Sequence, residues 1–409
     1  MRVLAVRAVL AAALLLPAGA GAQSLSLTEA QAIARLSDES PRVQAARASV
    51  DVARADALTA ARLPNPRVTF NREAVSGVAE NYFMVSQTLP VTGRRRLEMS
   101  AASSRVEAAS SRVDGEVRRL RAELRLAFTD LWAAQQRERE LVRNRERLRE
   151  LADVLAKREA GGESAGFDRL RAEREVLDVE SDRAGAASDR ARAQGVLTSF
   201  FPAALPAADG VEAVGTAPNA ATLPSVEELV ARAEMARGDL LSLTHERDVA
   251  SLMTQVADRR RLPEPEVVAG TKSSNAGTGD MGSIVSVHVN VPLFDRGRAE
   301  RAAAQARAGQ VDAQIAALRL TMQTEISAWR AAVIERRAIA ARYRTAVGGG
   351  TDDIERIAQI SYDNGEGGIL ELLDAHRTAS SARVRQVMLD AAVREAEIEL
   401  EFVSGWEIP

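Results

Sequence analysis

The sequence has no cysteine and few aromatic residues, and both shortages exclude classes of protein. Among its 409 residues there is no Cys, and only 3% are Phe, Trp or Tyr. Without cysteine the chain has no disulfide, no thiolate metal site, no cysteine nucleophile and no cysteine-linked lipid anchor. A conventional globular core of this size would need more aromatic side chains than this. Hydrophobic residues still make up 46% of the chain, which excludes global disorder.

Signatures of enzymes are also missing. The glycine-rich stretches 277–279 and 348–350 lack the Lys-Ser/Thr pair of a phosphate-binding loop. No Ser, His and Asp set carries the local signature of nucleophilic catalysis. The pair Asp352-Asp353 lies in a charge-rich helical context typical of a solvated surface. We therefore expect neither catalysis nor a cofactor.

The first 22 residues are predicted to be a secretory signal peptide. Arg2 and Arg7 give a positive start, residues 9–16 form an apolar run, and Ala20-Gly21-Ala22 has the form that signal peptidase cleaves. Removing those two arginines from the 54 basic residues leaves 52 against 57 acidic ones, a net charge of −5. A slightly acidic exported protein is a poor candidate for nucleic-acid binding. No later apolar run is long enough for a transmembrane helix.

Two long stretches are predicted to be helical. Residues 91–201 and 293–408 contain no proline and are rich in Ala, Arg, Glu and Leu. Their apolar residues form two ladders with the same spacing of 4, 3, 4, 4 and 3, displaced by 198 residues. The ladders are Val113, Val117, Leu120, Leu124, Phe128 and Leu131, and then Val311, Ile315, Leu318, Met322, Ile326 and Trp329. This spacing keeps a stripe on one helical face and is typical of coiled-coil-like packing.

The equal spacing of the ladders predicts an internal duplication. Residues 62–66 read Arg-Leu-Pro-Asn-Pro, and 199 residues later 261–265 read Arg-Leu-Pro-Glu-Pro. The alternative is chance similarity between helical stretches, but this does not explain why both halves share the same proline-containing segment. The predicted division is a signal peptide (1–22), a first repeat (23–201), a proline-rich linker (202–224), a second repeat (225–404) and a C-terminal tail (405–409).

Each repeat is predicted to contain a helix, two strands and a hairpin of two long helices. The first helices span 28–61 and 225–260, and the strands span 67–75, 81–89, 266–273 and 283–291. In the last strand Val285, Val287, Val289 and Val291 alternate with polar residues, the pattern of a strand that crosses a bilayer within a barrel. A soluble two-stranded ribbon is the alternative reading.

Neither strands nor helices are expected to be complete in one chain. A lone hairpin is marginally stable. The segment from Arg94 to Ala160 would form a helix about 100 Å long, which cannot fold into a compact core and must pack sideways. We therefore expect an oligomer.

This ordered set of features resembles the outer membrane factor family, the TolC-like exit ducts of bacterial efflux and secretion systems. The most telling local piece is Tyr362-Asp363-Asn364-Gly365 followed by residues 369–375, Ile-Leu-Glu-Leu-Leu-Asp-Ala. It is similar to the family's turn at the periplasmic end of the second hairpin, and residues 162–172 are a weaker equivalent in the first repeat. The resemblance covers about residues 25–404.

The resemblance implies an α+β membrane protein of long helical hairpins with four strands per chain. Three chains would form a homotrimer with a twelve-stranded barrel in the outer membrane and a twelve-helix tunnel in the periplasm. A periplasmic adaptor would meet the helical tips at turns that contain Gly162, Glu163, Gly365 and Glu366. The adaptor would link the duct to an inner-membrane pump of the resistance-nodulation-division type, which supplies the energy.

Two kinds of tip residue follow from the resemblance and from threefold symmetry. Glu371 and Asp374, three residues apart on one helical face, would form two stacked acidic rings at the pore entrance; a solvated helical face is the alternative. Tyr362 and Asp168 match positions that hold the tip closed by hydrogen bonds between hairpins. This chain departs from the family pattern by having Gly367-Gly368 where relatives carry a basic partner, and Arg169 or Arg171 is a candidate substitute.

Cargo and partner class are less determined by the sequence. Residues 87–96 look like the strand-to-helix junction of heavy-metal-cation exporters, so metal cations are preferred over drugs or organic solutes. His245, His288 and His376 are scattered and predict no metal site, and His288 reads as an ordinary polar position in the barrel lumen. The exit duct of type I protein secretion is an alternative, whereas a periplasmic adaptor is disfavoured because it has one hairpin and more β-structure.

Overall fold

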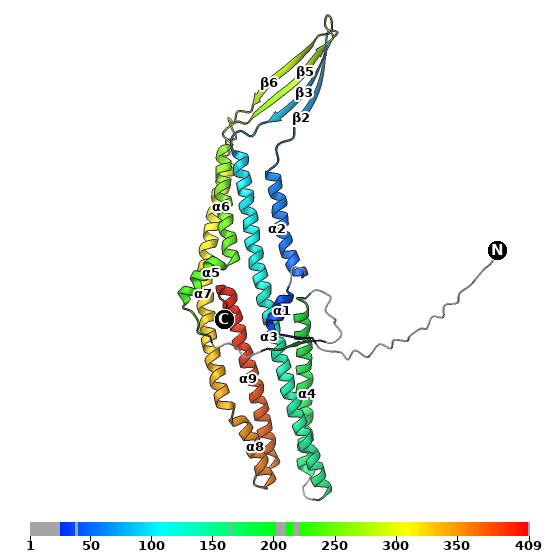
Figure 1. Cartoon of the computed structure of the whole chain (residues 1–409), viewed down its shortest axis with the longest axis vertical. Coiled ribbons are helices and arrows are strands. Elements are labelled where there is room, and N and C mark those ends of the chain that lie inside the picture. Colours follow the sequence, from blue (N-terminus) through cyan, green and yellow to red (C-terminus); the bar gives the residue numbers. More distant parts are fainter. Residues whose placement is uncertain (1–24, 37–39, 163–165, 202–209, 216–220, 408–409) are drawn as a thin grey trace, which may run out of the picture.

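The computed structural model describes residues 25–36, 40–162, 166–201, 210–215 and 221–407. The predicted signal peptide and residues 202–209 and 216–220 of the predicted linker therefore lie outside the described part. The molecule is elongated, with a β-sheet at one end and a long body of helices below it (Figure 1). In the described part, no helix is both long and apolar enough to span a bilayer.

The sheet contains four antiparallel strands in the order β2-β3-β5-β6. The strands are β2 (Arg67–Val75), β3 (Val78–Thr88), β5 (Pro265–Ser274) and β6 (Met281–Val289), which confirms the four predicted strands to within three residues at each end. The largest difference is at β3, where a loop was expected up to residue 80. Ser76 and Gly77 alone make the turn, at φ 51° and 86°, because a two-residue hairpin turn uses positive φ at both central positions.

The long helices follow the two strand pairs. Helix α3 (Arg94–Ala160) is a single helix of 67 residues, as predicted, and α4 (Gly166–Thr198) runs back along it. The second hairpin consists of α7 (Arg298–Val347), α8 (Gly350–Asp363) and α9 (Ile369–Ser404). One long helix was expected in place of α7 and α8. Adjacent glycines at 348 and 349 interrupt it, because glycine has low helix propensity.

The predicted first helix of each repeat is wrong, because each is two helices. The first half contains α1 (Glu29–Arg35) and α2 (Pro41–Ala60), and proline occupies the first position of α2, where a missing N–H costs nothing. The second half contains α5 (Val226–Ala236) and α6 (Gly238–Arg259), separated by Arg237 in an extended conformation. The order of elements is thus alike in both halves, while the boundaries of the two repeats stay a prediction.

A small parallel sheet was not predicted. Strand β1 (Leu25–Leu27) pairs with β4 (Val211–Ala213), which lies within the predicted linker. The buried amide of Gln135 on α3 accepts a hydrogen bond from the Ala213 N–H at 3.2 Å and donates one to the Val211 carbonyl at 3.5 Å. These bonds dock the strand pair against the middle of α3.

The apolar ladders form the cores, and they form two cores rather than one. Leu124, Phe128 and Leu131 of the first ladder are buried with β1, β4 and the end of α4. The second ladder lies in another cluster with α5 and α9, and its buried members are Val311, Ile315, Met322 and Ile326. A third cluster near the tip joins α3, α4 and α9. The predicted fold class, long helical hairpins with a small sheet, is confirmed.

The break between α5 and α6 coincides with a close helix crossing. A Cβ placed on Gly238 would lie 2.1 Å from the Ser111 carbonyl oxygen and 2.7 Å from the Gly115 nitrogen, both on α3. The backbones of α6 and α3 therefore touch at a point that no side chain fits.

Replacing Gly238 with Ala is expected to destabilise the protein by more than about 1 kcal/mol, because the α3 backbone must move to admit a methyl group. Gly185→Ala on α4 is the matched control, since a Cβ there meets nothing within 4 Å. The control is expected to be neutral or stabilising by up to about 1 kcal/mol. Thermal melts followed by circular dichroism measure both, and equal melting temperatures for the two variants would contradict the crossing.

Candidate channel wall and tip gate

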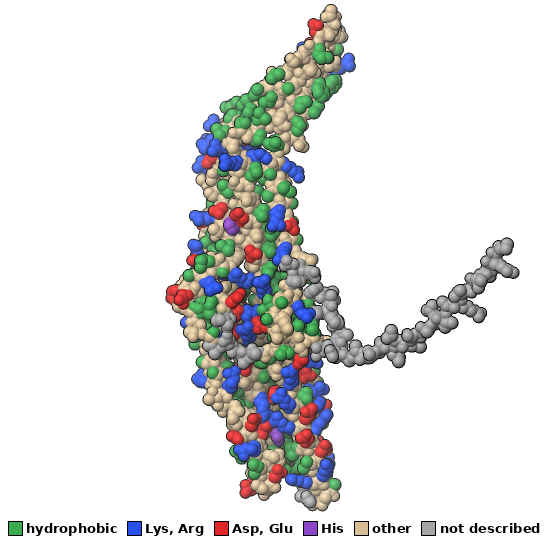
Figure 2. Space-filling model, in the orientation of Figure 1, with side chains coloured by type: hydrophobic (Ala, Val, Ile, Leu, Met, Phe, Trp, Pro, Cys, Tyr) green, Lys and Arg blue, Asp and Glu red, His purple; other side chains and the backbone are tan. Residues whose placement is uncertain are grey.

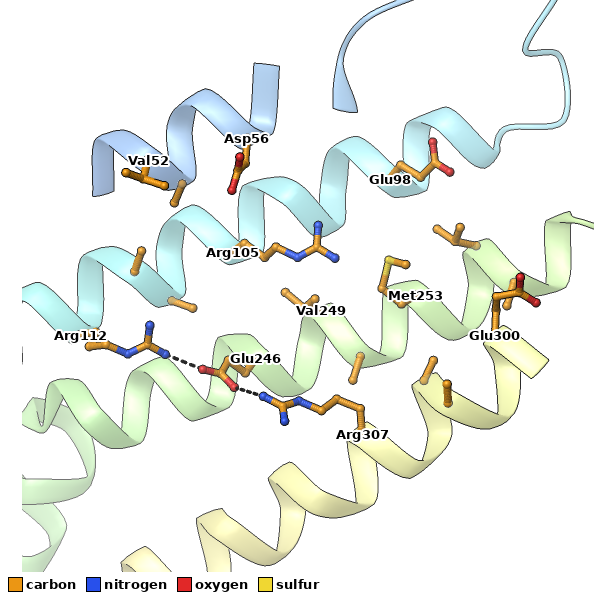
Figure 3. Close-up of a pocket in the computed structure, with 18 of the residues that line it drawn as sticks. Val52, Asp56, Glu98, Arg105, Arg112, Glu246, Val249, Met253, Glu300 and Arg307 are labelled. Atoms are coloured by element: carbon orange, nitrogen blue, oxygen red, sulfur yellow. Dashed lines mark hydrogen bonds and ion pairs between the residues drawn. The ribbon is translucent and has the colours of Figure 1, made fainter. Parts of the chain in front are cut away.

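The sheet has an apolar face whose members are fixed by the register. Val68 pairs with Val85, Val85 with Ala269, and Ala269 with Val285, and directly paired residues lie on the same face. Val68 is 62% exposed and Val285 79% exposed. Figure 2 shows the hydrophobic side chains gathered over the sheet. A patch of this kind marks a surface that contacts lipid or protein.

The opposite face of the sheet is polar. Lys272 Nζ lies 2.7 Å from Glu80 Oε2, and the hydroxyl of Tyr82 donates to the same carboxylate at 2.6 Å. The register places the following side chains on this face too: Thr69, Asn71, Glu73, Ser86, Glu266, Ser286 and His288. His288 thus lies on the polar face, as expected, and its Nε2 is 3.5 Å from Ser286 Oγ. A sheet with one apolar and one polar face suits a wall between lipid and water.

Both outer strands of the sheet have an unpaired edge. In the described part of the chain, β2 pairs only with β3, and β6 pairs only with β5. Each edge carries backbone N–H and C=O groups along nine residues without a strand partner. Unpaired edges next to an apolar face are a template for pairing with another chain.

At the far end of the molecule, the tips of the two hairpins touch. The Tyr362 hydroxyl on α8 donates to Asp168 Oδ2 on α4 at 3.4 Å. The Arg158 guanidinium of α3 lies over the Tyr362 ring, 5.8 Å from its centre, and 3.5 Å from Asp363. Burial, and after it the negative charge of Asp168, raises the pKa of Tyr362 above its ordinary value.

A second junction between the hairpins lies further from the tip. The Glu355 carboxylate on α8 accepts from Arg147 of α3 at 2.7 and 2.8 Å and from Arg383 of α9 at 3.2 and 2.7 Å. His376 Nδ1 of α9 lies 3.5 Å from the same carboxylate. Burial alone would raise the pKa of Glu355, but Arg383 and Arg147 outweigh it and lower that pKa. Helix α8 is thus held to α3 and α9 through one carboxylate.

The chain is similar to known proteins in both sequence and fold. Residues 229–405 match the sequence model of the family described as Outer membrane efflux protein. The chain is 23% identical over 365 residues to the cobalt-zinc-cadmium resistance protein CzcC of Cupriavidus metallidurans, covering 89% of this chain and 86% of that protein. Two solved structures share the fold. The outer-membrane channel OprN has a TM-score of 0.76 at 19% identity, with 92% of this chain and 89% of that one covered. The open MtrE outer membrane channel of Neisseria gonorrhoeae has a TM-score of 0.73 at 17% identity, with 92% and 88% covered.

Residues 229–405 thus match the outer membrane efflux protein family, and the chain as a whole has the fold of solved outer-membrane channels. These matches support an outer-membrane channel with a large periplasmic helical portion. Its sheet is the outer-membrane end, and its helical tips are the periplasmic end. The resemblance drawn from the sequence is confirmed.

The residues predicted at the tip fall into three groups. Tyr362 and Asp168 are brought together, while their gating role stays a prediction. Glu371 and Asp374 are exposed on α9, and Glu371 already accepts from the Gly368 N–H at 2.9 Å, so it caps its own helix. Both tip turns use a left-handed glycine, Gly162 at φ 77° and Gly365 at φ 74°, with Glu366 exposed beside the second; Glu163 lies outside the described residues.

Arg169, a candidate substitute for the basic gate partner, is engaged within its own hairpin, and its gating role stays a prediction. Arg169 pairs with Glu159 at 2.5 Å and with Glu173 at 2.7 Å, both within the first hairpin. Arg171 is exposed and, among the described residues, makes no ion pair. Arg158 instead supplies the positive charge beside Tyr362. In the sequence, the signal that could have identified Arg158 is its position one helical turn before the glycine pair 161–162, opposite the turn of the second hairpin.

In the described part of the chain, the three histidines belong to no candidate metal site. Among the described residues, no group of three or more His, Asp or Glu side chains is arranged to hold a metal ion. His376 is only 8% exposed. Burial is the largest effect on it and lowers its pKa below the ordinary 6.5, against the opposing pull of Glu355.

The lowered pKa of His376 predicts acid sensitivity of the tip. Below pH 6.5 the unfolded chain binds the His376 proton more readily than the folded chain, so stability falls as the pH drops below that value. The contribution of Glu355, whose pKa is lowered from 4.5, is present above pH 4.5 and is lost only at lower pH. Of these two tip groups, His376 is therefore the one that acts between pH 7 and 5.

We expect His376→Gln to reduce the loss of thermal stability between pH 7 and pH 5, because Gln does not titrate. His245→Gln on α6 is the control, since its side chain is 30% exposed and lies far from α8. Melting temperatures at several pH values measure both variants. An unchanged pH profile for His376→Gln would exclude this histidine as the cause.

Proposed function

We propose that three copies of this chain close into one conduit, with a twelve-stranded barrel above a twelve-helix tunnel. The observation that carries the proposal is the open sheet, whose β2 and β6 edges lack partners in the described chain. Pairing β6 of one copy with β2 of the next satisfies both edges, and three copies of a four-stranded sheet give twelve strands. The apolar face then turns to lipid and the polar face to the lumen.

The tip is proposed to be the regulated end of this conduit. Tyr362 bonded to Asp168 ties the second hairpin to the first, and separation of these tips would widen the entrance. The turns at Gly162, Glu163, Gly365 and Glu366 are the proposed contact with a periplasmic adaptor. The adaptor connects the duct to a proton-driven inner-membrane pump of the resistance-nodulation-division type.

The proposed cargo is heavy-metal cations. The relative from Cupriavidus metallidurans is named for cobalt, zinc and cadmium resistance, and threefold symmetry would repeat Glu371 and Asp374 as rings at the entrance. Carboxylate rings favour cations over anions. A wide duct need not bind its cargo, so the absence of a ligand cluster in the described residues does not oppose this.

The ring proposal predicts cation selectivity that the two acids control. Protein reconstituted in planar bilayers should conduct cations in preference to anions, and Glu371→Gln with Asp374→Asn should reduce that preference. A control with Asp178→Asn and Asp353→Asn removes the same charge from other exposed positions on α4 and α8. If the control pair lowers selectivity as much as the ring pair, or neither does, the rings are excluded.

The cargo is tested in cells. A strain that lacks this gene should become more susceptible to cobalt, zinc and cadmium salts, and expression of the wild-type chain should restore growth. Dyes and antibiotics are tested in parallel. Susceptibility confined to dyes and antibiotics would move the assignment to organic solutes, and loss of a secreted protein with unchanged susceptibility would move it to protein secretion.

A further inference from the structure

Four segments join the sheet to the helices, here called the crossings, and they lie near one level: residues 61–66, 89–93, 260–264 and 290–297 (Figure 1). The Leu89 N–H donates to the Pro265 carbonyl at 2.9 Å, and Thr92 Oγ1 donates to Glu264 at 2.9 Å. Arg260 spans the next gap, with Nη1 2.6 Å from a Glu300 oxygen. These bonds join crossings from both halves of the chain (Figure 1). If the membrane boundary lies at this level, all four crossings lie at that boundary.

Each crossing exposes apolar side chains at this level. Phe294 is 98% exposed, so it has almost no contact within its own chain. The other exposed apolar residues of the four crossings are Leu63 at 60%, Leu89 at 38%, Val91 at 67%, Leu262 at 46%, Val291 at 61% and Leu293 at 63%. They extend the apolar face of the sheet down to the first turns of the helices.

Exposed arginines accompany these apolar residues at every crossing. We name them the arginine band: Arg62, Arg96, Arg259, Arg296 and Arg298. Within the described ranges none of the five forms an ion pair. Figure 2 shows basic side chains where the hydrophobic surface of the sheet gives way to the helices.

The acids at this level are already engaged by other arginines. Glu264 pairs with Arg94 at 3.0 Å, and Asp258 pairs with Arg301 at 3.0 Å and with Arg261 at 3.3 Å. Glu300 pairs with Arg260 at 2.6 Å, and Asp295 lies 3.9 Å from the same arginine and accepts from the Gly297 N–H at 3.1 Å. Glu266, a further carboxylate here, lies on the polar face of the sheet. The arginine band therefore keeps an uncompensated positive charge beside apolar surface.

We propose that the arginine band binds the anionic headgroups of phospholipids in the inner leaflet of the outer membrane. The strands of 9 to 11 residues are of the length that spans a bilayer, and the crossings are at their periplasmic end. A guanidinium matches a phosphate by two parallel hydrogen bonds. A cation next to apolar surface fits an amphiphile, because the acyl chains cover Phe294 and Leu293 while the headgroup meets Arg296. A free phosphate ion would leave that apolar surface in water.

The test measures lipid selectivity of the full chain in vesicles of dioleoylphosphatidylcholine. Electron paramagnetic resonance of spin-labelled phosphatidylglycerol and phosphatidylcholine gives the relative association of each lipid with the protein. The test variant replaces one arginine at each crossing with glutamine, at Arg62, Arg96, Arg259 and Arg296. The matched control replaces four exposed arginines of the helical body that make no ion pair among the described residues, Arg121, Arg171, Arg342 and Arg385. Far-UV circular dichroism checks that both remain folded.

Wild-type protein and the control are expected to prefer phosphatidylglycerol. In the test variant, the preference for phosphatidylglycerol over phosphatidylcholine should fall by about fivefold for each replaced arginine that contacts a headgroup. Equal association of both lipids with the wild type, or an equal loss in the control, would overturn the proposal. Excess inorganic phosphate at constant ionic strength should leave the preference intact; if phosphate abolishes it, the band is a site for free anions and the lipid assignment fails. The outcome is independent of what the channel carries.

Discussion

The structure depends on a requirement for hydrogen bonding that one chain does not meet. A four-stranded sheet with one apolar face leaves the backbone groups of β2 and β6 without strand partners in the described chain. In a bilayer each unpaired backbone group costs several kcal/mol, so a sheet with free edges is excluded there. Closure with other copies removes the cost. The long helices continue the same arrangement into the periplasm, where α3 alone extends over 67 residues.

The helical body has a dense ionic cluster in its middle and a second set of polar contacts near the tip. In the middle, three residues form a dense ionic cluster: Glu397 is fully buried, Arg337 lies 2.7 Å from it, and Arg394 bridges it to Glu29 of α1. Near the tip, α8 is separated from α7 by two glycines and is held to the first hairpin by Glu355 and Tyr362. Breaking one partner of a buried charge pair is costly, so these polar contacts help to hold α8 in place, together with Ala358 and Tyr362, which pack against the apolar cluster of the tip.

The parts of the fold that were predictable from sequence are those with a local pattern. Alternation in Val285, Val287 and Val289 and the bounding prolines located the strands, and the proline-free stretch located α3. Pro41 also marked the start of α2 in the sequence, but the helical pattern on either side of it masked the break. The α5–α6 break depends on contact between Gly238 and α3, which no local pattern reveals. Strands β1 and β4 are three residues each and pair across 186 positions, too short to show a period.

For the candidate site, the contact of Tyr362 with Asp168 was accessible only through the family resemblance, since 194 positions separate them. Arg147, Glu355 and His376 carry no motif, and only the folded structure brings them together.

The most direct test of the central claim uses the absence of cysteine. One cysteine in β2 at Phe70 and one in β6 at Ser283, Val285 or Val287 lie about 14 Å or more apart within a chain, because β3 and β5 separate the two strands. A disulfide, which needs Cα atoms within about 7 Å, therefore forms only between chains. Oxidation in detergent micelles should give a covalent trimer for at least one pair, and each single-cysteine variant should stop at a dimer or stay uncrosslinked. A ladder that continues beyond three chains, or no cross-link for any pair, would contradict a closed three-chain conduit.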